Sequence, residues 1–400
     1  MKTNNILLWR ESMDRSTWRC LIGGICSLMV AMGIGRFAYT PILPLMQADL
    51  RFSDAAAGWL ASSNYAGYLA GALLTSALPL QKRRIGWLRS SLAVSIVTTG
   101  IMGLTHSYIC MLLVRFVSGA ASAFIFVLSS GMVLDKLAAA GKTHYAGFFY
   151  SGVGLGILLS TLLIPGLNRL FMWEGAWIGL SIFSGMLAVW AWVWIHDSPE
   201  QSGHPGQKDS HAALSQGTAR KEFPYLVLAY GLEGLGYIVT GTFIVSIADR
   251  TSSFAIDPSI VWMAVGAGAI PSCIIWSVIA KRWGYVKALV LSMILQSASI
   301  ALPVLWASPS GFITSALLFG ATFMGITTLA TTLARQMNLS SSSRMIGYLT
   351  ASYAAGQMAG PAIAGWLSSQ TQSFQAALVG AAGAVFLGGL LLAGGMRRLA

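Results

Sequence analysis

The feature that most constrains this chain is a succession of apolar runs, each about as long as a helix that crosses a lipid bilayer. A membrane-spanning helix needs about 20 consecutive, mostly apolar residues. The runs between polar breaks predict an all-α polytopic membrane protein with twelve transmembrane helices. The expected spans are 18–45, 56–80, 88–105, 108–134, 144–166, 174–195, 223–248, 259–279, 286–306, 311–335, 345–368 and 374–396.

The composition agrees with a chain that lies in a membrane. Hydrophobic residues make up 55% of the 400 residues and charged residues only 10%, whereas soluble domains carry about 25% charged residues. Most of the surface therefore does not face water, and the lipid bilayer is the first partner that we expect.

The positive charge of the chain also has a membrane explanation. The net charge is +12, but the cations lie in short loops and at the tail, with no basic patch interleaved with aromatic residues. No nucleic-acid partner is therefore expected. With both termini inside, the outer segments hold only Arg51, Arg169 and Arg250. The positive-inside rule then predicts a multi-pass protein of the cell inner (plasma) membrane with both termini cytoplasmic.

One polar stretch divides the chain. Residues 197–222 form the only long polar segment, which is rich in Ser, Gly and Pro, as flexible linkers are. We expect a cytoplasmic linker at 197–222, between an N-terminal six-helix bundle at 1–196 and a C-terminal six-helix bundle at 223–400.

The two halves repeat weakly but in order. Three matches at nearly one offset predict two six-helix halves related by an axis along the membrane normal. In transporters of this plan one half rocks against the other. The matches are Gly33-Ile-Gly35 with Gly234-Leu-Gly236 at an offset of 201, 147–156 with 347–356 at 200, and 82–86 with 280–284 at 198.

Arg36 is a cation inside a helix-length apolar stretch. A charge at bilayer depth is costly and usually faces a partner or a watery cavity. Arg36 is therefore expected to hold an anionic substrate group or a carboxylate partner in a central cavity. The alternative is structural: Arg36 would cap backbone carbonyls freed by Pro41 and Pro44, because proline cannot donate a hydrogen bond.

Glu233 is the only acid in the interior of any expected span. The repeat places Glu233 opposite Met32, one helical turn from Arg36. Our hypothesis is that Glu233 is the proton-coupling site, which either cycles a proton or exchanges Arg36 as its partner during transport. The alternative is a permanent structural ion pair.

Three strings carry a resemblance to a known family. The most specific is Gly33-Ile-Gly-Arg-Phe-Ala-Tyr-Thr-Pro-Ile-Leu-Pro44, supported by Trp59-x4-Asn64-Tyr-x-Gly-Tyr68 and Tyr230-x2-Glu233-Gly-x-Gly-Tyr237. On these strings the chain resembles the major facilitator superfamily, and in particular its YbfB/YjiJ branch, over nearly its full length. The resemblance implies the major facilitator fold, with twelve helices in two six-helix bundles.

Further substrate-binding candidates lie in the runs that are expected to line the cavity. Asn64 either binds substrate or bridges to a neighbouring helix. Gln296 is expected to pack, because its helix lies peripherally in the resembling fold. The candidates besides Arg36 are Tyr39, Asn64, Tyr65, Tyr68, Tyr237 and Gln357.

Arg115 opens Arg115-Phe-Val-Ser-Gly119, which is similar to the Arg-x3-Gly motif of the superfamily. In related proton-driven exporters the equivalent arginine assists proton movement, so the resemblance makes Arg115 a second proton-coupling candidate. A packing or interface-anchoring role is the alternative, since long basic side chains can snorkel to the membrane surface.

Two glycine-rich runs are interpreted as close-packing and gating faces, because small residues let helices approach. The Gly-Pro pair typical of proton-coupled drug antiporters is missing from the fifth run and occurs in the eleventh, which weakens an antiporter assignment. The residues are Gly152 and Gly156 in the fifth run, and Gly356, Gly360 and Pro361 in the eleventh.

Other chemistry has no visible place in the expected spans. All five histidines lie in loops or at helix ends, and no His/Asp/Glu constellation lies within a span, so no metal site is expected. The four cysteines are interpreted as packing residues. The glycine-rich runs follow no strand and precede no Lys-Ser/Thr, which excludes a nucleotide motif. We expect no cofactor and no enzymatic activity.

The sequence thus predicts a secondary active transporter of a small organic solute, working by alternating access and coupled to protons. The buried cation suggests an organic acid or an amino acid as the substrate, and the chain is expected to work as a monomer. The alternatives are a multidrug/proton efflux antiporter or a non-transporting membrane sensor or scaffold.

Overall fold

The structure, a computed structural model, describes residues 13–78, 83–196, 216–251, 257–337 and 342–396. Within these ranges every regular element is a helix. The elements are α1 (Arg15–Leu28), the π-helix η2 (Met29–Ile34), α2 (Tyr39–Leu50), α3 (Asp54–Ala77), α4 (Arg84–Met102), α5 (Tyr108–Ala139), the short 3₁₀ turn η4 (Thr143–Tyr145), α6 (Ala146–Trp194), α7 (Gln216–Asp249), α8 (Ser259–Trp283), α9 (Tyr285–Leu305), α10 (Pro309–Met337), α11 (Ser342–Thr371) and α12 (Gln375–Gly395).

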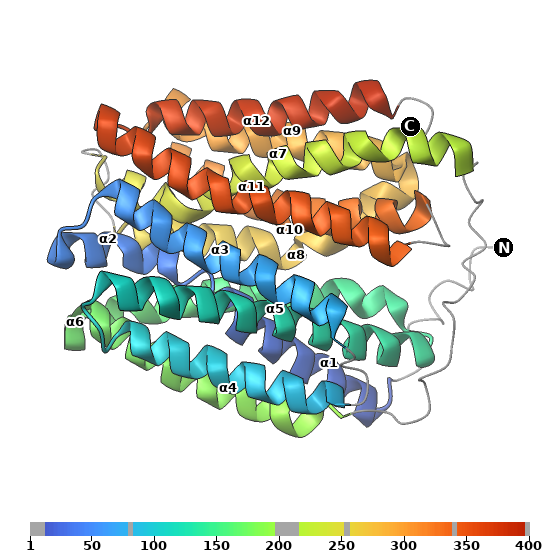
Figure 1. Ribbon diagram of the computed structural model, residues 1–400, viewed down its shortest axis with the longest axis horizontal. Coiled ribbons are helices and arrows are strands. Elements are labelled where there is room, and N and C mark those ends of the chain that lie inside the picture. Colours follow the sequence, from blue (N-terminus) through green and yellow to red (C-terminus); the bar gives the residue numbers. More distant parts are fainter. Residues whose placement is uncertain (1–12, 79–82, 197–215, 252–256, 338–341, 397–400) are drawn as a thin grey trace.

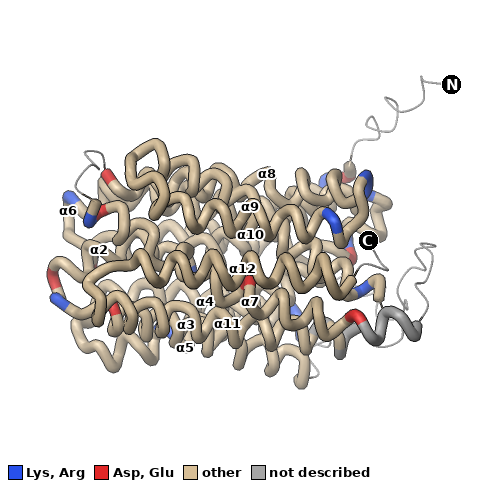
Figure 2. The backbone as a smooth tube through the Cα atoms, turned by 90° about the horizontal axis from the view of Figure 1, so that it is seen from above, with Lys and Arg blue, Asp and Glu red and all other residues tan. Residues whose placement is uncertain are grey.

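The helices run roughly along the longest axis of the molecule. Figure 1 shows those of the first half of the chain, blue to green, mostly below those of the second half, yellow to red. The charged residues gather toward the two ends of this axis, and the length between them is almost free of charge (Figure 2). Among the described residues, nine helical segments are long and apolar enough to cross a membrane. The structure is therefore that of an all-helical, multi-pass membrane protein.

The first span is not the continuous helix that the apolar run 18–45 predicts. The chain passes from α1 into the π-helix η2, then through a turn at 35–38 into α2. A Cβ on Gly33 would lie 2.4 Å from the Cα of Gly156 in α6, so only glycine permits this close approach. Sequence periodicity missed the break because the apolar pattern continues through it. The turn carries Arg36.

The fifth and sixth expected spans form one long element with a break inside it. Within α6, Phe171 and Met172 have non-helical backbone angles, and Met172 has a positive φ of 58°. Trp173, the next residue, is buried. The break therefore lies between the two runs that the sequence separates.

The expected linker is shorter than 197–222 at its C-terminal end. Residues 197–215 lie outside the described part of the chain, whereas α7 already begins at Gln216. The segment 216–222 was assigned to the linker because it is polar, but it contains the good helix formers Ala, Arg, Lys and Glu. The two bundles at 1–196 and 223–400 stay a prediction.

Equivalent glycines of the predicted repeat pack in equivalent ways. Gly156 of α6 lies against Gly33, while a Cβ on Gly356 of α11 would lie 3.1 Å from the carbonyl carbon of Gly234. Thr40 Oγ1 donates to the carbonyl oxygen of Gly241 at 2.5 Å, and these residues are 201 positions apart. Residues at the repeat offset therefore meet where α2 and α7 cross.

Candidate functional site

Arg36 lies in the turn between η2 and α2 and is only 3% exposed. Its Nη2 donates to Oε1 of Gln357 on α11 at 2.8 Å, and its Nη1 lies 4.0 Å from the sulfur of Met32. Its Nε has no hydrogen-bond partner among the described residues. The hydrogen bond to Gln357 thus joins Arg36, after the first helix of the chain, to the eleventh expected span.

Aromatic rings surround the guanidinium of Arg36. Its central carbon lies 4.6 Å from the ring centre of Tyr65, 4.5 Å from that of Tyr68 and 5.5 Å from that of Phe37. The faces of aromatic rings attract cations, but each contact contributes only about 0.5–2 kcal/mol. No ion pair to Arg36 occurs in the described part of the chain, so its charge is stabilised by rings and one amide rather than by an anion.

Gln357 connects Arg36 to a row of stacked rings. Its Nε2 donates to the hydroxyl of Tyr237 on α7. The ring of Tyr237 stacks on Tyr353 at 5.6 Å, and Tyr353 stacks on Tyr230 at 4.2 Å. Phe323 of α10 lies on the other side of Tyr237, at 6.1 Å. Tyr65, Tyr68, Tyr237 and Gln357 of the expected substrate-binding set therefore lie together around Arg36 or directly behind it.

Glu233 lies on α7 beyond this row and is completely buried. Neither carboxylate oxygen has a hydrogen-bond partner of ordinary geometry among the described residues. Tyr237 and Tyr353 are near both Arg36 and Glu233. The ion pair that the sequence left open is therefore not formed in this structure.

Gln296 of α9 is a polar side chain close to the carboxyl group of Glu233. It is fully buried, and neither its nitrogen nor its oxygen has a partner of ordinary geometry in the described residues. The sequence analysis assigned Gln296 to packing because of the peripheral place of its helix. The sequence signal that could have identified Gln296 is an amide side chain within an apolar helix, because an unpaired buried amide is costly.

Arg115 of α5 lies near Arg36 but has different hydrogen-bond partners. It is 1% exposed, and it donates to the carbonyl oxygens of Gly35 at 3.3 Å and Leu60 at 3.5 Å. The carbonyl of Gly35 lies at the break of the first helix, where the regular ladder of backbone hydrogen bonds is interrupted. Arg115, and not Arg36, therefore donates to a backbone carbonyl at this break.

Tyr39 and Asn64 lie on the Arg115 side. The ring of Tyr39 is 4.6 Å from the guanidinium carbon of Arg115, and its hydroxyl donates to the carbonyl of Ala57 at 3.0 Å. Asn64 Nδ2 donates to the carbonyl of Arg115 at 2.9 Å and so bridges α3 and α5. The structure does not bring these two side chains into contact with the Arg36 guanidinium.

The predicted packing glycines lie at close helix crossings. A Cβ on Gly152 would lie 2.7 Å from the carbonyl oxygen of Ile25 in α1, and one on Gly360 would lie 2.5 Å from that of Leu235 in α7. Gly156 and Gly356 make the contacts described above. The carbonyl oxygen of Pro361 would lie 2.2 Å from a Cβ on Gly58, so Pro361 is at the crossing of α11 with α3.

Comparison with known proteins identifies the family. Residues 28–393 match the family described as "Uncharacterised MFS-type transporter YbfB". The chain belongs to this family.

Two further comparisons agree with this family of major facilitator transporters. The chain is 25% identical over 360 residues to the "Uncharacterized MFS-type transporter YceJ" of Bacillus subtilis (strain 168), which covers 88% of this chain and 90% of that protein. Its fold is similar to that of a crystallised mutant of the nucleoside transporter NupG, with a TM-score of 0.73 and 14% identity over 94% of this chain and 99% of that one. The family supports membrane transport, and the structural likeness supports the fold.

A polar cluster around Asp54, at one end of the helices, was not predicted from the sequence. Arg250, just after α7, donates to both carboxylate oxygens of Asp54 at 2.6 and 2.8 Å. Gln47 of α2 donates to Asp54 at 2.9 Å, and Ser368 of α11 donates to it at 2.8 Å. Asp54 therefore joins α2, α3, α7 and α11. The signal in the sequence was Arg250, one of very few cations in the outer segments.

The hydrogen bonds of Asp54 control its charge. Burial raises the pKa of this carboxyl group, but the bonds from Arg250, Gln47 and Ser368 outweigh burial and hold the pKa below its ordinary value. Asp54 is therefore charged at neutral pH, and its bond with Arg250 is the charge-assisted, two-pronged kind that arginine makes with carboxylates.

Proposed function

We propose that this chain is a secondary active transporter that moves a small organic solute by alternating access between two six-helix bundles, 1–196 and 223–400. The number and length of the helices are consistent with twelve membrane crossings. The nine apolar segments include the run Thr143–Trp194, which is long enough to cross twice and breaks in the middle. The two remaining crossings are α3 and α11, of 24 and 30 residues.

The surroundings of Arg36 are the main support for the proposed substrate class. A desolvated cation without an anionic partner is costly, and the described residues provide only rings, one amide and a thioether sulfur around it. A carboxylate would supply the missing charge and accept the two-pronged hydrogen bonds that a guanidinium donates. The proposed substrate is therefore an organic acid or an amino acid.

Glu233 is the proposed proton-coupling residue. A buried carboxylate without hydrogen-bond donors is costly in its charged form, and taking up a proton removes that charge. Gln357 links Arg36 to Tyr237 by hydrogen bonds, Tyr237 stacks on Tyr353, and both tyrosines are near Glu233. An anion bound at Arg36 would therefore change the electrostatic potential at Glu233. Proton-driven transport needs such a coupling between the substrate site and the proton site.

The test of the substrate class is thermal stabilisation of the purified protein by small solutes. A ligand that binds only the folded state raises its stability. We expect carboxylates or amino acids to raise the melting temperature of the wild type and to lose this effect in Arg36→Ala. Arg89→Ala, which removes an arginine near the charged ends, is the matched control and should keep the effect. Stabilisation by carboxylates that survives Arg36→Ala would contradict the proposal.

A multidrug/proton efflux antiporter is the second candidate, and the aromatic row favours it. The stacked rings of Tyr230, Tyr353, Tyr237 and Phe323 are a surface suited to flat, apolar cations. In the same screen, this function predicts stabilisation by bulky organic cations that Arg36→Ala leaves intact.

The proposed setting is the cell inner membrane, with both termini cytoplasmic and one chain as the working unit. The bias of Lys and Arg toward one side supports this orientation. Labelling of a cysteine introduced at Ser202, in the proposed cytoplasmic linker, by a membrane-impermeant reagent tests it. Labelling should require broken cells or inside-out vesicles.

A further inference from the structure

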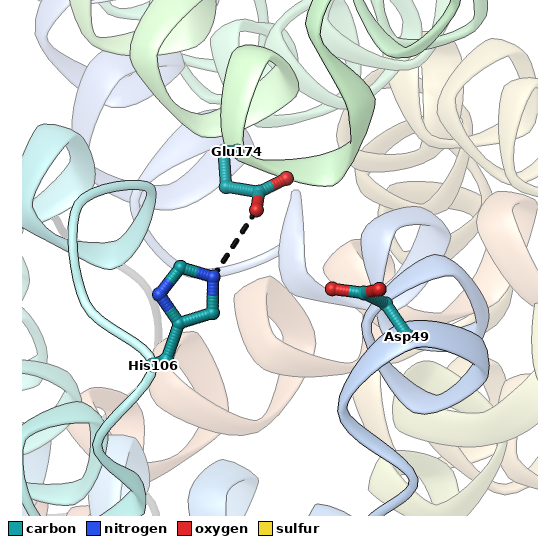
Figure 3. A group of neighbouring side chains, drawn as sticks. All are labelled: Asp49, His106 and Glu174. Carbon is teal, nitrogen blue, oxygen red and sulfur yellow. Dashed lines mark hydrogen bonds and ion pairs between the residues drawn. The ribbon is translucent and has the colours of Figure 1, made fainter.

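Three ligand-type side chains meet at one end of the molecule, outside the site around Arg36. Asp49 lies near the end of α2, His106 lies in the connection between α4 and α5, and Glu174 follows the break in α6. Figure 3 shows the carboxylate of Asp49 pointing toward the pair formed by His106 and Glu174. All three residues lie in or next to segments that the sequence places on the outer side of the membrane.

The ligand atoms of the three residues are close enough to share one ion. They all lie within 4.8 Å of one another, and Nε2 of His106 is 3.2 Å from Oε1 of Glu174. In a tetrahedral zinc site with bonds near 2.1 Å, neighbouring ligand atoms are about 3.4 Å apart. Small rotations of exposed side chains are enough to close this difference.

The second carboxylate oxygen of Glu174 takes no part in the ion pair with His106. Its Oε2 is buried and has no hydrogen-bond partner among the described residues, although the side chain as a whole is 27% exposed. An exposed His–Glu pair alone contributes only about 0–1 kcal/mol. It leaves this oxygen unsatisfied.

Trp173 orients two of the three ligands. Its indole Nε1 donates to Oδ2 of Asp49 at 2.8 Å, and its ring lies edge-on to the imidazole of His106 with the ring centres 5.5 Å apart. Trp173 is itself buried and immediately precedes Glu174 in the chain. Metal ligands are commonly held in this way by a second layer of hydrogen bonds, which fixes their rotamers before the ion binds.

We propose that Asp49, His106 and Glu174 bind a divalent transition-metal ion, with Zn²⁺ as the best match. One imidazole nitrogen and two carboxylate oxygens are ligands that zinc accepts, and three protein ligands leave a fourth position for water. The bound ion would join the outer ends of α2, α4–α5 and α6. The sequence analysis missed this site because it looked for constellations within the spans.

The test is a Zn²⁺ titration of the full-length purified protein in a Cys110→Ser background, which removes the only cysteine that is not buried. Calorimetry should show one saturable Zn²⁺ site per chain. His106→Gln and Asp49→Asn should each weaken the affinity at least tenfold. His144→Gln, at a different loop, is the matched control and should leave the affinity unchanged.

The melting temperature gives an independent readout. Zn²⁺ should raise it in the Cys110→Ser protein and in His144→Gln, but not in His106→Gln, and Mg²⁺ at the same concentration should have no effect. The absence of a saturable site would overturn the proposal. So would Zn²⁺ binding of the same affinity in His106→Gln and Asp49→Asn, which would indicate ligands elsewhere on the chain.

Discussion

Two buried arginines that lie near one shared tyrosine, Tyr65, have different surroundings. Arg115 donates to two backbone carbonyls at the break of the first helix, whereas Arg36 has an amide, a thioether sulfur and ring faces. Both lie near Tyr65, so the two cations also repel each other across it. At the scale of single residues, we therefore propose that Arg115 holds the break of the first helix and that Arg36 binds substrate. Nη2 of Arg115 also lacks a hydrogen-bond partner among the described residues, and its part in proton coupling stays a prediction.

Replacing Arg115 by methionine should destabilise the protein strongly. The substitution keeps much of the side-chain volume but removes the charged donor to the carbonyls of Gly35 and Leu60, and among the described residues only the Gly35 carbonyl keeps a second side-chain donor, Ser118 Oγ at 3.3 Å. Each hydrogen bond from a charged donor contributes about 1.5–3 kcal/mol. Thermal unfolding in detergent measures the loss. Arg36→Met is the matched control and should cost less, because Arg36 donates to no backbone carbonyl in the described residues. Equal losses would contradict the division of roles.

Glu233→Gln should remove the pH dependence of transport without preventing folding. Glutamine has nearly the same shape and cannot take up or release a proton, so solute binding should persist while proton-driven accumulation is lost. Uptake into vesicles at two external pH values measures this. Asp135→Asn, which removes an exposed acid paired with Arg84, should behave as the wild type. Full pH-dependent uptake by Glu233→Gln would exclude Glu233 as the coupling residue.

At the scale of elements, helices α1, η2 and α2 show what the sequence could and could not predict. The apolar run marked the span. The glycines predicted to pack in the fifth and eleventh runs lie at close helix crossings, and their gating role stays a prediction. The π-helix and turn at 29–38 were not predicted, because they depend on the contact between Gly33 and Gly156, which are far apart in sequence. Hydrophobic periodicity contains no information on such a contact.

Gly156→Ala should weaken the packing of the first helix against α6 and lower the melting temperature. A Cβ at this position would lie 2.8 Å from the Cα atoms of both Gly33 and Met29, and overpacking of this kind typically costs about 1–3 kcal/mol. Gly166→Ala, in the same helix, is the control. A Cβ there meets nothing within 4 Å, so alanine should be neutral or slightly stabilising. A melting temperature unaffected by Gly156→Ala would contradict the close packing described here.

At the scale of the whole molecule, several contacts join parts of the chain that are far apart in sequence. Asp54 joins Arg250 and Ser368, and Ser62 donates to the carbonyl of Met358. Alternating access requires contacts of this kind to open during the cycle. The charge pair of Asp54 and Arg250 is therefore the proposed outer latch.

The latch should weaken in acid. Because the pKa of Asp54 is held below its ordinary value of 3.8 in the folded protein, its contribution to stability is fully present above 3.8 and is lost as the pH falls through the lower, folded-state value. Asp54→Asn should remove this part of the acid dependence. Melting temperatures between pH 2 and pH 7 measure it, with Asp135→Asn, at an exposed carboxylate, as the matched control. Identical acid profiles for the wild type and Asp54→Asn would contradict the assignment.

The same long-range contacts explain why the site was only partly predictable. Arg36 and Glu233 could be identified because a charge inside an apolar run is conspicuous in any sequence. Gln357, although named as a candidate, could not be assigned to Arg36 as its partner, since 321 residues separate them. Two further clusters are assembled from loops and helix ends, where no periodic pattern constrains position. They are the pair of Asp54 and Arg250 and the trio of Asp49, His106 and Glu174.

The most direct test of the account is solute flux in proteoliposomes that contain the purified wild type or Arg36→Ala. A carboxylate or amino acid that stabilises the wild type would be supplied with and without an imposed proton gradient. The account predicts uptake above protein-free vesicles that increases with the gradient, and uptake near background for a folded Arg36→Ala protein. Equal, gradient-dependent uptake by both proteins would contradict Arg36 as the substrate anchor.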